Sequence, residues 1–493
     1  MNQLNLQNAI DSQFGTGKAT VTDNGDGTYF VTFKESGREY NISNSNISNT
    51  QKILDANPGE LSGDGTEKSP YLIESIEDLV YFASDVSNGN TYSGKYVKLQ
   101  NSLNFYATSS YVNPNVKNFA GYEGELKTAL TTGDGFKGIG TSLAKNDETD
   151  KNNSFCGYFD GNNKNISNCY INKNLSDSGN SNMYGFFGAY LYGEVKNLGI
   201  IGIEYNIIAE NYSTAISGIA GKLYDDGKLN NCYTSGNITL TINGNINANV
   251  AGLIDYNRGK IENCHNNISI NVKIANNNSS SALHCAGIAI NNERETAYIK
   301  NSYNSGNILA TMQSGIYAQI AGIVRALDYG SVENCYNSGN ISTTINNTTT
   351  ESYIGGIVAK SSSNGFLNNI YNSGEIGIDL EGTQVYSGGI IGKCSGLISS
   401  SYNIGNIINI KSKTNCLIGE IAGNITSTAT IFNSFYIKNS AYAVNSSNEY
   451  NINKISKEQL QDDCSLNILN SNEINWKKDI NGKNSGYPIL SWQ

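Results

Sequence analysis

The sequence predicts an all-β protein, a right-handed parallel β-helix (a solenoid) with three strands in each coil. Helical caps and a small N-terminal α+β segment complete the predicted fold. Three observations indicate it: a unit of about 34 residues recurs, each unit holds three short apolar runs, and Gly, Asn or Ser bounds these runs. Gly and Asn tolerate left-handed backbone, so this composition is typical of tight turns between short strands.

One glycine recurs at the same place in each unit, and we call these residues the anchor glycines. They are spaced by 34, 35, 35, 34 and 33 residues, at Gly218, Gly252, Gly287, Gly322, Gly356 and Gly389. One unit cannot cover its own apolar face, so neighbouring units must stack. The stacked strands pair in parallel at about 4.8 Å, and parallel crossovers prefer a right-handed path. An array of helices with this period is excluded, because the units lack Ala, Leu and Glu at helical spacing.

The first 50 residues predict a small separate module. Leu6, Ile10 and Phe14 have the spacing of one helix face. Residues 19–22 and 28–33 have strand-like patterns on either side of an Asp- and Gly-rich turn, which is typical of a β-hairpin.

Capped helices are predicted on both sides of the repeat. Ser75 and Asp78 form a capping-box-like start, and the helix has an apolar face of Ile76, Leu79, Val80 and Ala83. A strand follows at 96–99. Downstream, a second capped helix is predicted from Ser456 to about Leu469. Such lids cover the unpaired strand edges of the terminal coils. The expected domains are a helix-plus-hairpin module at 1–55, an N-terminal cap at 56–182, the repeat at 183–440 and a C-terminal cap at 441–493.

Stacking also predicts ladders of equivalent residues. One position is held by Cys169, Cys232, Cys264 and Cys335, and elsewhere by Leu198, Ser302, Ile370 and Ser401. This exchange of small and apolar residues predicts an inward-facing, dry site. The nine cysteines form no Cys-x-x-Cys pair and no cluster at zinc spacing, so we expect reduced, mostly buried thiols and no metal.

The next position predicts an aromatic ladder, which runs through Tyr170, Tyr233, His265, Tyr303, Tyr336, Tyr371 and Tyr402. Its structural interpretation is ring packing from coil to coil. Its functional interpretation is a platform for sugar rings, which makes the members from Tyr233 to Tyr402 ligand-binding candidates.

The repeats resemble the GLUG motif of bacterial cell-surface and adhesin-like proteins. The resemblance covers roughly residues 60–493 and includes the lead-in at 63–73 and the segment at 159–166. The ending at 486–492 looks like the closing strand of the family. It implies an extracellular surface protein. The first 50 residues weakly resemble the soluble part of type IV pilin-like proteins, and a small lid for the β-helix is the alternative.

Charged residues gather in one loop of consecutive coils. Arg258 follows Asp255, Arg294 lies between Glu293 and Glu295, and Arg325 precedes Asp328. Three interpretations stay open. The charges are surface ion pairs, or Arg258 and Arg294 belong to a ligand-binding patch, or a catalytic face carries acids and bases. That catalytic face would consist of Asp255, Arg258, Glu293, Arg325 and Asp328.

The composition excludes several functions. The net charge of −10 and the four arginines leave no basic stripe for nucleic acid. No nucleotide-binding loop, dinucleotide fingerprint, nucleophile elbow or zinc-peptidase motif is present, so no cofactor is expected. The sequence has no run of about 18 apolar residues that would predict a membrane span. The N-terminus is too polar for a secretion signal, so either the protein is cytoplasmic or an export segment is absent from this chain.

The sequence therefore predicts a non-enzymatic, extracellular or cell-surface protein whose β-helix binds a glycan or a host or cell-surface protein. The first alternative is a polysaccharide lyase or glycoside hydrolase that acts on one face. The second is an inert stalk or fibre spacer.

Overall fold

The computed structural model describes residues 7, 11, 19–23, 28–33, 39–43, 61–105, 135–143, 151–175, 182–210, 213–275, 281–382, 384–409, 416–437, 452–471 and 473–493. The predicted N-terminal hairpin is confirmed: β1 (Ala19–Asp23) and β2 (Thr28–Phe33) are antiparallel, and β3 (Glu39–Ser43) adds a third strand. Leu6, Ile10 and Phe14 of the predicted first helix lie outside the described residues.

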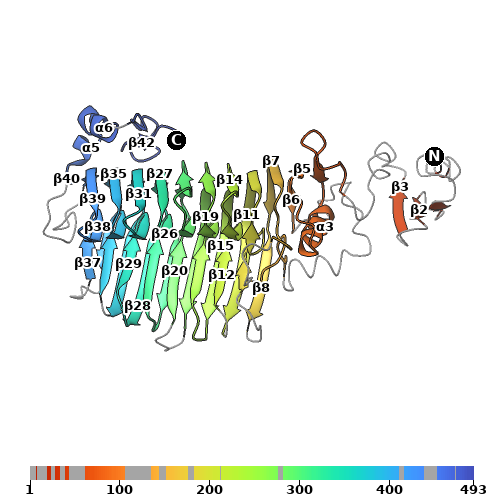
Figure 1. The fold of residues 1–493 in the computed structure, drawn as a ribbon, viewed down its shortest axis with the longest axis horizontal. Helices are drawn as coiled ribbons and strands as arrows, with labels where there is room; N and C mark the ends of the chain where they lie inside the picture. The colour runs from red at the N-terminus through yellow and green to blue at the C-terminus, as the bar shows by residue number, and fades with distance from the viewer. Residues whose placement is uncertain are drawn as a thin grey trace.

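The predicted parallel β-helix is confirmed, with about eight coils stacked in one column (Figure 1). Two parallel sheets have eight strands each. Sheet I consists of β9 (Asn182–Tyr184), β12 (Thr214–Ser217), β16 (Ala248–Ala251), β20 (Ala282–Ala286), β25 (Tyr317–Ala321), β29 (Ser352–Gly355), β33 (Val385–Gly388) and β37 (Cys416–Gly419). Sheet II consists of β10 (Tyr190–Leu191), β13 (Ala220–Leu223), β17 (Ile254–Asn257), β21 (Ala289–Asn292), β26 (Val324–Leu327), β30 (Val358–Ser361), β34 (Ile391–Cys394) and β38 (Ala422–Ile425).

Sheet III forms the third face, and in most coils a bend divides it into two or more strands. Its strands before the repeat are β4 (Tyr71–Ile73), β5 (Tyr96–Leu99), β6 (Leu103–Asn104), β7 (Tyr158–Ser167) and β8 (Tyr170–Leu175). Its strands in the coils are β11 (Glu194–Ala209), β14 (Lys228–Asn230), β15 (Tyr233–Ile242), β18 (Lys260–Glu262), β19 (His265–Ile274), β22 (Tyr298–Lys300), β23 (Tyr303–Asn304), β24 (Ile308–Met312), β27 (Gly330–Asn337), β28 (Ile341–Thr348), β31 (Gly365–Asn372), β32 (Ile376–Gly382), β35 (Leu397–Asn403), β36 (Ile407–Asn409), β39 (Thr430–Tyr436) and β40 (Ile452–Lys454).

The abundant asparagines have a backbone role within sheet III. A column of residues with φ between 48° and 55° precedes the predicted cysteine ladder, and its members include Asn231, Asn263, Asn301, Asn334 and Asn369. This left-handed conformation bends the strand, and Asn adopts it more readily than other residues with a Cβ atom.

The anchor glycines form a second column, in which backbones of adjacent coils approach closely. A Cβ atom on Gly322 would lie 2.1 Å from the carbonyl oxygen of Gly356 and 2.4 Å from Cγ of Asn337. The same clash with the next glycine recurs at Gly287 and Gly356. The repeat therefore excludes a side chain at this position, and the prediction that the anchors of adjacent coils are neighbours is confirmed.

A buried ladder of asparagine side chains fills the space beside these glycines. Each Nδ2 donates to Oδ1 of the asparagine in the next coil at 2.7–3.0 Å, through Asn266, Asn304, Asn337, Asn372 and Asn403. All are 0–1% exposed. Thr234 donates to Asn266 at one end, and Glu420 accepts from Asn403 at the other. Because a buried amide must be hydrogen-bonded, each coil depends on its neighbour.

The capping elements agree with the prediction in part. Helix α3 (Ile76–Ser87) begins with the Ser75 and Asp78 capping box. The predicted C-terminal helix is instead two short helices, α5 (Lys457–Leu460) and α6 (Asp463–Leu469), because Asp462 caps a new helix start. The predicted closing strand, β42 (Ile489–Leu490), pairs antiparallel with β41 (Trp476–Lys477) rather than joining the parallel sheets.

The cysteine ladder is confirmed as buried and reduced at Cys232, Cys264 and Cys335. Burial raises the pKa of the Cys335 thiol to about 12, so it is inert as a nucleophile. The assignment of Cys169 and Tyr170 to the two ladders is wrong, because Tyr170 pairs with Glu204 whereas Tyr233 pairs with Gly199. The register of β11 shifts between Ile200 and Ile203. The residues of β8, which pair with β11 after this shift, are therefore offset from the ladder positions.

Replacing Gly322 with Ala should lower the free energy of unfolding by about 3 kcal/mol, because the new methyl group meets backbone and a buried amide. Gly377→Ala is the matched control, because the nearest atoms to its Cβ would lie 3.9 Å away; it should change stability by less than about 0.5 kcal/mol. Equal denaturant midpoints for the two variants would contradict the close packing.

Asn337→Leu keeps the volume but removes both ladder contacts and the bond to the Gly339 carbonyl. An N–H of Asn304 and the Oδ1 of Asn372 then lose their partner in the adjacent coil. We expect a loss of about 3–5 kcal/mol in the same measurement. Asn271→Leu, at an exposed position of β19, should have little effect. An Asn337→Leu protein as stable as the wild type would show that the ladder contributes nothing.

Candidate functional site

The candidate site lies outside the core, where sheets I and II meet. From β12 and β13 onward, two residues such as Gly356 and Ile357 join the two strands of each coil. Outward side chains of the two strands contact each other across this turn, as Asn249 does with Asp255 and Arg325 with Gln319. We call this surface the corner groove. Its sheet I side carries Asn249, His284, Gln319, Tyr353 and Tyr386, and its sheet II side carries Asp255, Arg325, Lys360 and Lys393.

The N-terminal part of the groove is a buried polar network. Asn249 Nδ2 donates to Asp255 at 3.1 Å, and Oδ1 of the same amide lies 2.7 Å from His284 Nδ1. In the coil that follows His284, Arg325 donates to Gln319 at 3.0 Å. Asp255 is 0% exposed, and His284 and Arg325 are each 7% exposed. His284 Nε2 and Arg325 Nε have no hydrogen-bond partner among the described residues.

Burial determines the charge state of this network. It raises the pKa of Asp255 to about 7, although the hydrogen bond from Asn249 and the Arg325 charge oppose the rise. Burial, together with Arg325 and Lys360, holds the pKa of His284 well below its usual value. His284 is therefore neutral at pH 7. The Asn249 amide that donates to Asp255 presents its oxygen to His284, which places the imidazole proton on Nδ1.

Further along, the groove opens into a cavity of about 540 Å³, within the range of ligand pockets. It is lined by Tyr317, Gln319, Thr350, Glu351, Tyr353, Lys360, Ser361, Lys393 and Ser395. Strand side chains from three successive coils build most of this lining, so the cavity has rigid walls.

One wall of the cavity is a closed cluster around Glu351. Its carboxylate accepts from Tyr353 at 2.5 Å and from Tyr386 at 3.4 Å, and it pairs with Lys393 at 3.6 Å. These hydrogen bonds, chiefly that of Tyr353, lower the pKa of Glu351. The Tyr353 and Tyr386 rings stack with centroids 5.9 Å apart.

The five residues of the predicted catalytic face do not form one site. Asp255 and Arg325 lie in the corner groove two coils apart, and Asp255 is wholly buried. Arg258 pairs with Glu293 of the next coil at 2.9 Å rather than with Asp255. Asp328 acts on Arg325 only through its charge.

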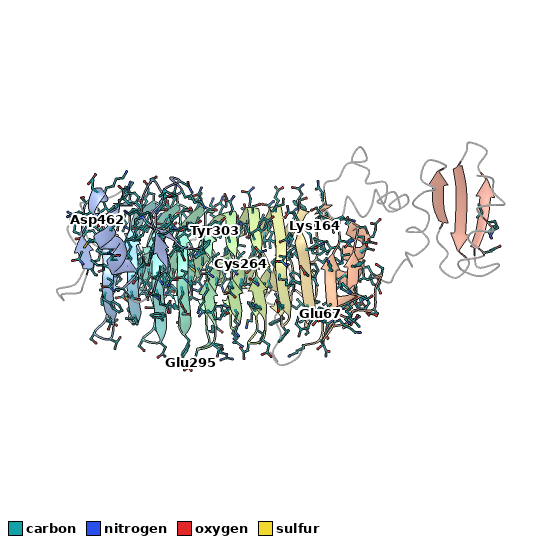
Figure 2. The ribbon with its side chains drawn as sticks, turned by 90° about the horizontal axis from the view of Figure 1, so that it is seen from above. Glu67, Lys164, Cys264, Glu295, Tyr303 and Asp462 are labelled. Carbon is teal, nitrogen blue, oxygen red and sulfur yellow. The ribbon has the colours of Figure 1, made fainter. Side chains whose placement is uncertain are left out.

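Arg294, which stands between Glu293 and Glu295 in the sequence, pairs with Asp225 two coils away at 3.4 Å. Both partners are exposed, and Figure 2 shows Glu295 of the same loop at the outer edge of the column. Pairing between coils, rather than within a loop, thus organises these charges. This pattern agrees with the ion-pair interpretation.

The predicted aromatic ladder is present on the outer face of sheet III. The rings stack with centroids 4.7–5.0 Å apart and interplanar angles of 1–8°, through Tyr233, His265, Tyr303, Tyr336, Tyr371 and Tyr402. Each inner ring is covered on both faces by its neighbours, so only ring edges remain for solvent. This geometry favours the structural interpretation, because sugar stacking needs a free ring face.

The C-terminal cap also covers the later part of this ladder, as Figure 1 shows where α5, α6 and β42 lie beside β31, β35 and β39. Trp476 packs on Tyr371 and Tyr402, and Trp492 packs on Tyr303 and Tyr336. The indole nitrogens donate to Asn369 and to the Asn334 carbonyl. The ladder thus anchors the cap.

Sequence reasoning found Asp255 and Arg325 but missed Asn249, His284, Gln319, Tyr317, Tyr353, Lys360 and Lys393. A signal was available in the period. Asn249, His284, Gln319, Tyr353 and Tyr386 each stand three residues before an anchor glycine, and Asp255 and Arg325 stand three residues after one. Lys360 and Lys393 stand four residues after one.

Within the described residues, no group of three or more His, Cys, Asp and Glu side chains is placed to hold a metal ion. In the same part of the chain, every helix is too short or too polar to cross a membrane.

Asp255→Asn should change how stability depends on pH. The native state holds the carboxyl protonated up to about pH 7, whereas an unfolded Asp ionises near its usual value of 3.8, so wild-type stability falls as pH rises between these values. The variant lacks this loss and should gain up to about 4 kcal/mol relative to the wild type across that window. Melting temperatures at pH 5 and 8 test this, with exposed Asp226→Asn as the control. A pH-independent difference would contradict the raised pKa.

This chain is similar to known proteins in sequence and in structure. No family model matches the chain, so the GLUG resemblance stays a prediction. The chain is similar to halomucin from Haloquadratum walsbyi, with 23% identity over 251 residues, which is 48% of this chain but 2% of halomucin. It is also similar to the crystal structure of a "putative immunoglobulin A1 protease" from Bacteroides ovatus, with 19% identity, 87% of this chain and 95% of that chain covered, and a TM-score of 0.38. Neither likeness assigns an activity to this β-solenoid.

Proposed function

We propose that this chain is a non-enzymatic, extracellular surface protein that binds a glycan in the corner groove. The observation that carries the proposal is the cavity between sheets I and II. Its lining consists of tyrosines, hydroxyls, an amide and charged groups, without an aliphatic side chain. A ligand that fits this lining presents many hydroxyl groups and some apolar ring surface, which is the chemistry of a saccharide.

The walls of the cavity favour binding by pre-organisation. The tyrosines and lysines come from strands paired on both sides, and Glu351 fixes Tyr353, Tyr386 and Lys393 together. Side chains that are already ordered lose little freedom when a ligand binds. A groove along successive coils also suits an extended chain of sugar units.

The carboxylates support binding rather than hydrolysis. A glycoside hydrolase uses two carboxyl groups, one of which stays protonated to act as an acid. Glu351 is the one carboxylate in the cavity lining, and its hydrogen bonds favour the ionised form. Asp255 has the raised pKa of an acid, but it is fully buried and does not reach the cavity.

The surface location rests on the resemblance of the repeats to the GLUG motif. The match to halomucin is compatible with it but covers too little of that protein to decide the location. The glycan, rather than a host protein, is the proposed partner because the cavity is concave and polar.

The test is a glycan array probed with the full chain, followed by calorimetry on the glycans that bind. Tyr317→Ala should weaken binding about tenfold, because it removes an aromatic wall of the cavity. Tyr158→Ala is the matched control, since this tyrosine is 43% exposed on β7, in an earlier coil, and should bind like the wild type.

Three results would overturn the proposal. If no glycan binds, the inert-spacer alternative is favoured. If Tyr317→Ala binds as tightly as the wild type, the groove is not the site. If new reducing ends or unsaturated sugars appear during incubation, the protein is an enzyme.

A further inference from the structure

We infer that the saccharide bound in the corner groove is acidic, and that Lys360 binds its carboxylate or sulfate group. The inference rests on the proposed function and adds the chemical class of the ligand. It follows from the way in which the charges of the cavity are paired.

Lys360 lies on β30 in register with Ala326 and Lys393 of the adjacent coils. It is half-buried and lines the cavity. Among the described residues, no hydrogen bond or ion pair to its ammonium group is found, although the Asp328 charge acts on it. Burial and the charges of Arg325 and Lys393 disfavour its charged form and lower its pKa, against the opposing charge of Asp328.

The other charges of the cavity are engaged. Lys393 pairs with Glu351 and contacts the hydroxyl and ring of Tyr353. Arg325 does not line the cavity, and it donates to Gln319 in the buried part of the groove. Glu351 is saturated by two tyrosines and one lysine. Lys360 is therefore the cation of this lining that is left to meet a ligand.

An anion beside Lys360 would remove an unfavourable arrangement. Burial and the two flanking cations lower the pKa of Lys360, which means that its charged form lacks stabilisation in the free protein. A carboxylate or sulfate would supply that stabilisation through a charge-assisted hydrogen bond. The hydroxyls of Thr350, Ser361 and Ser395 stand in the same lining and suit the neutral hydroxyls of the same sugar.

A neutral glycan would displace water from the Lys360 ammonium and would leave it only the charge of Asp328, with no ion pair or hydrogen bond to an anion. Burying an unpaired charge is costly. The cavity is therefore built to discriminate against neutral sugars, since specificity arises from what a wrong ligand leaves unpaired.

The experiment uses two matched pairs of oligosaccharides in calorimetry with the full chain. One pair is oligogalacturonate and its methyl ester, and the other is sulfated and unsulfated dextran oligosaccharide. We expect the charged member of at least one pair to bind about tenfold to a hundredfold more tightly than its neutral partner. The pair that shows the difference identifies carboxylate or sulfate as the recognised group.

Lys360→Gln should abolish that preference, whereas Lys360→Arg should retain it. Lys273→Gln, at an exposed position of β19, is the control and should not change binding. The Lys360→Gln protein should melt at or above the wild-type temperature, because it loses a like-charge repulsion, so weaker binding cannot be attributed to unfolding.

The inference is overturned if neither charged oligosaccharide binds more tightly than its neutral partner, or if Lys360→Gln keeps the preference. Binding of neutral glycans alone in the array would refute the acidic ligand but leave the glycan-binding proposal intact. Absence of all glycan binding would refute both.

Discussion

The interlocking of a bare glycine backbone with a buried asparagine side chain is the constraint on which the column depends. The amide of Asn337 bonds to the asparagines one coil before and one coil after it, and also to the carbonyl of Gly339 in its own coil. It reaches them because Gly322 has no side chain in its way. A buried amide without partners is costly. Glycine and asparagine accordingly recur together from Gly252 and Asn266 to Gly389 and Asn403, whereas Thr234 stands beside Gly218 at the end of the ladder. Outward positions carry no such requirement. The groove therefore displays Asn, His, Gln and Tyr in successive coils of one scaffold.

The same distinction explains how far the sequence predicts the structure. The anchor glycines repeat because packing demands one residue type, so their period reveals the parallel stack. Asp255 and Arg325 are visible as charges, but their partners are not, because Asn249 and Gln319 are chosen by side-chain reach across a turn. Arg258 and Arg294 likewise find carboxylates in other coils, which loop sequence alone does not indicate. Tyr170 was misplaced because the register shift in β11 follows from local backbone geometry rather than from the repeat.

The outer faces of the column have different roles. On sheet III, aromatic rings stack edge-outward, and the C-terminal segment returns along several coils to cover them, with Trp476 and Trp492 against the rings. This contact couples the end of the chain to strands formed more than 100 residues earlier. Sheets I and II, by contrast, meet at an angle that gathers polar groups into a cavity. One face thus stabilises the column, while the corner between the other two offers the chemistry for a ligand.

Glu420 gives the column a defined end. It stands where earlier coils have the anchor glycine, and its carboxylate accepts the hydrogen bond of Asn403 that a further asparagine would otherwise receive. A ladder of identical amides has no intrinsic length, since every rung leaves the same demand for the next. One acidic residue satisfies the final donor without creating a new one. The asparagine ladder thereby ends at a single position, and a unit inserted upstream of it would leave this last hydrogen bond in place.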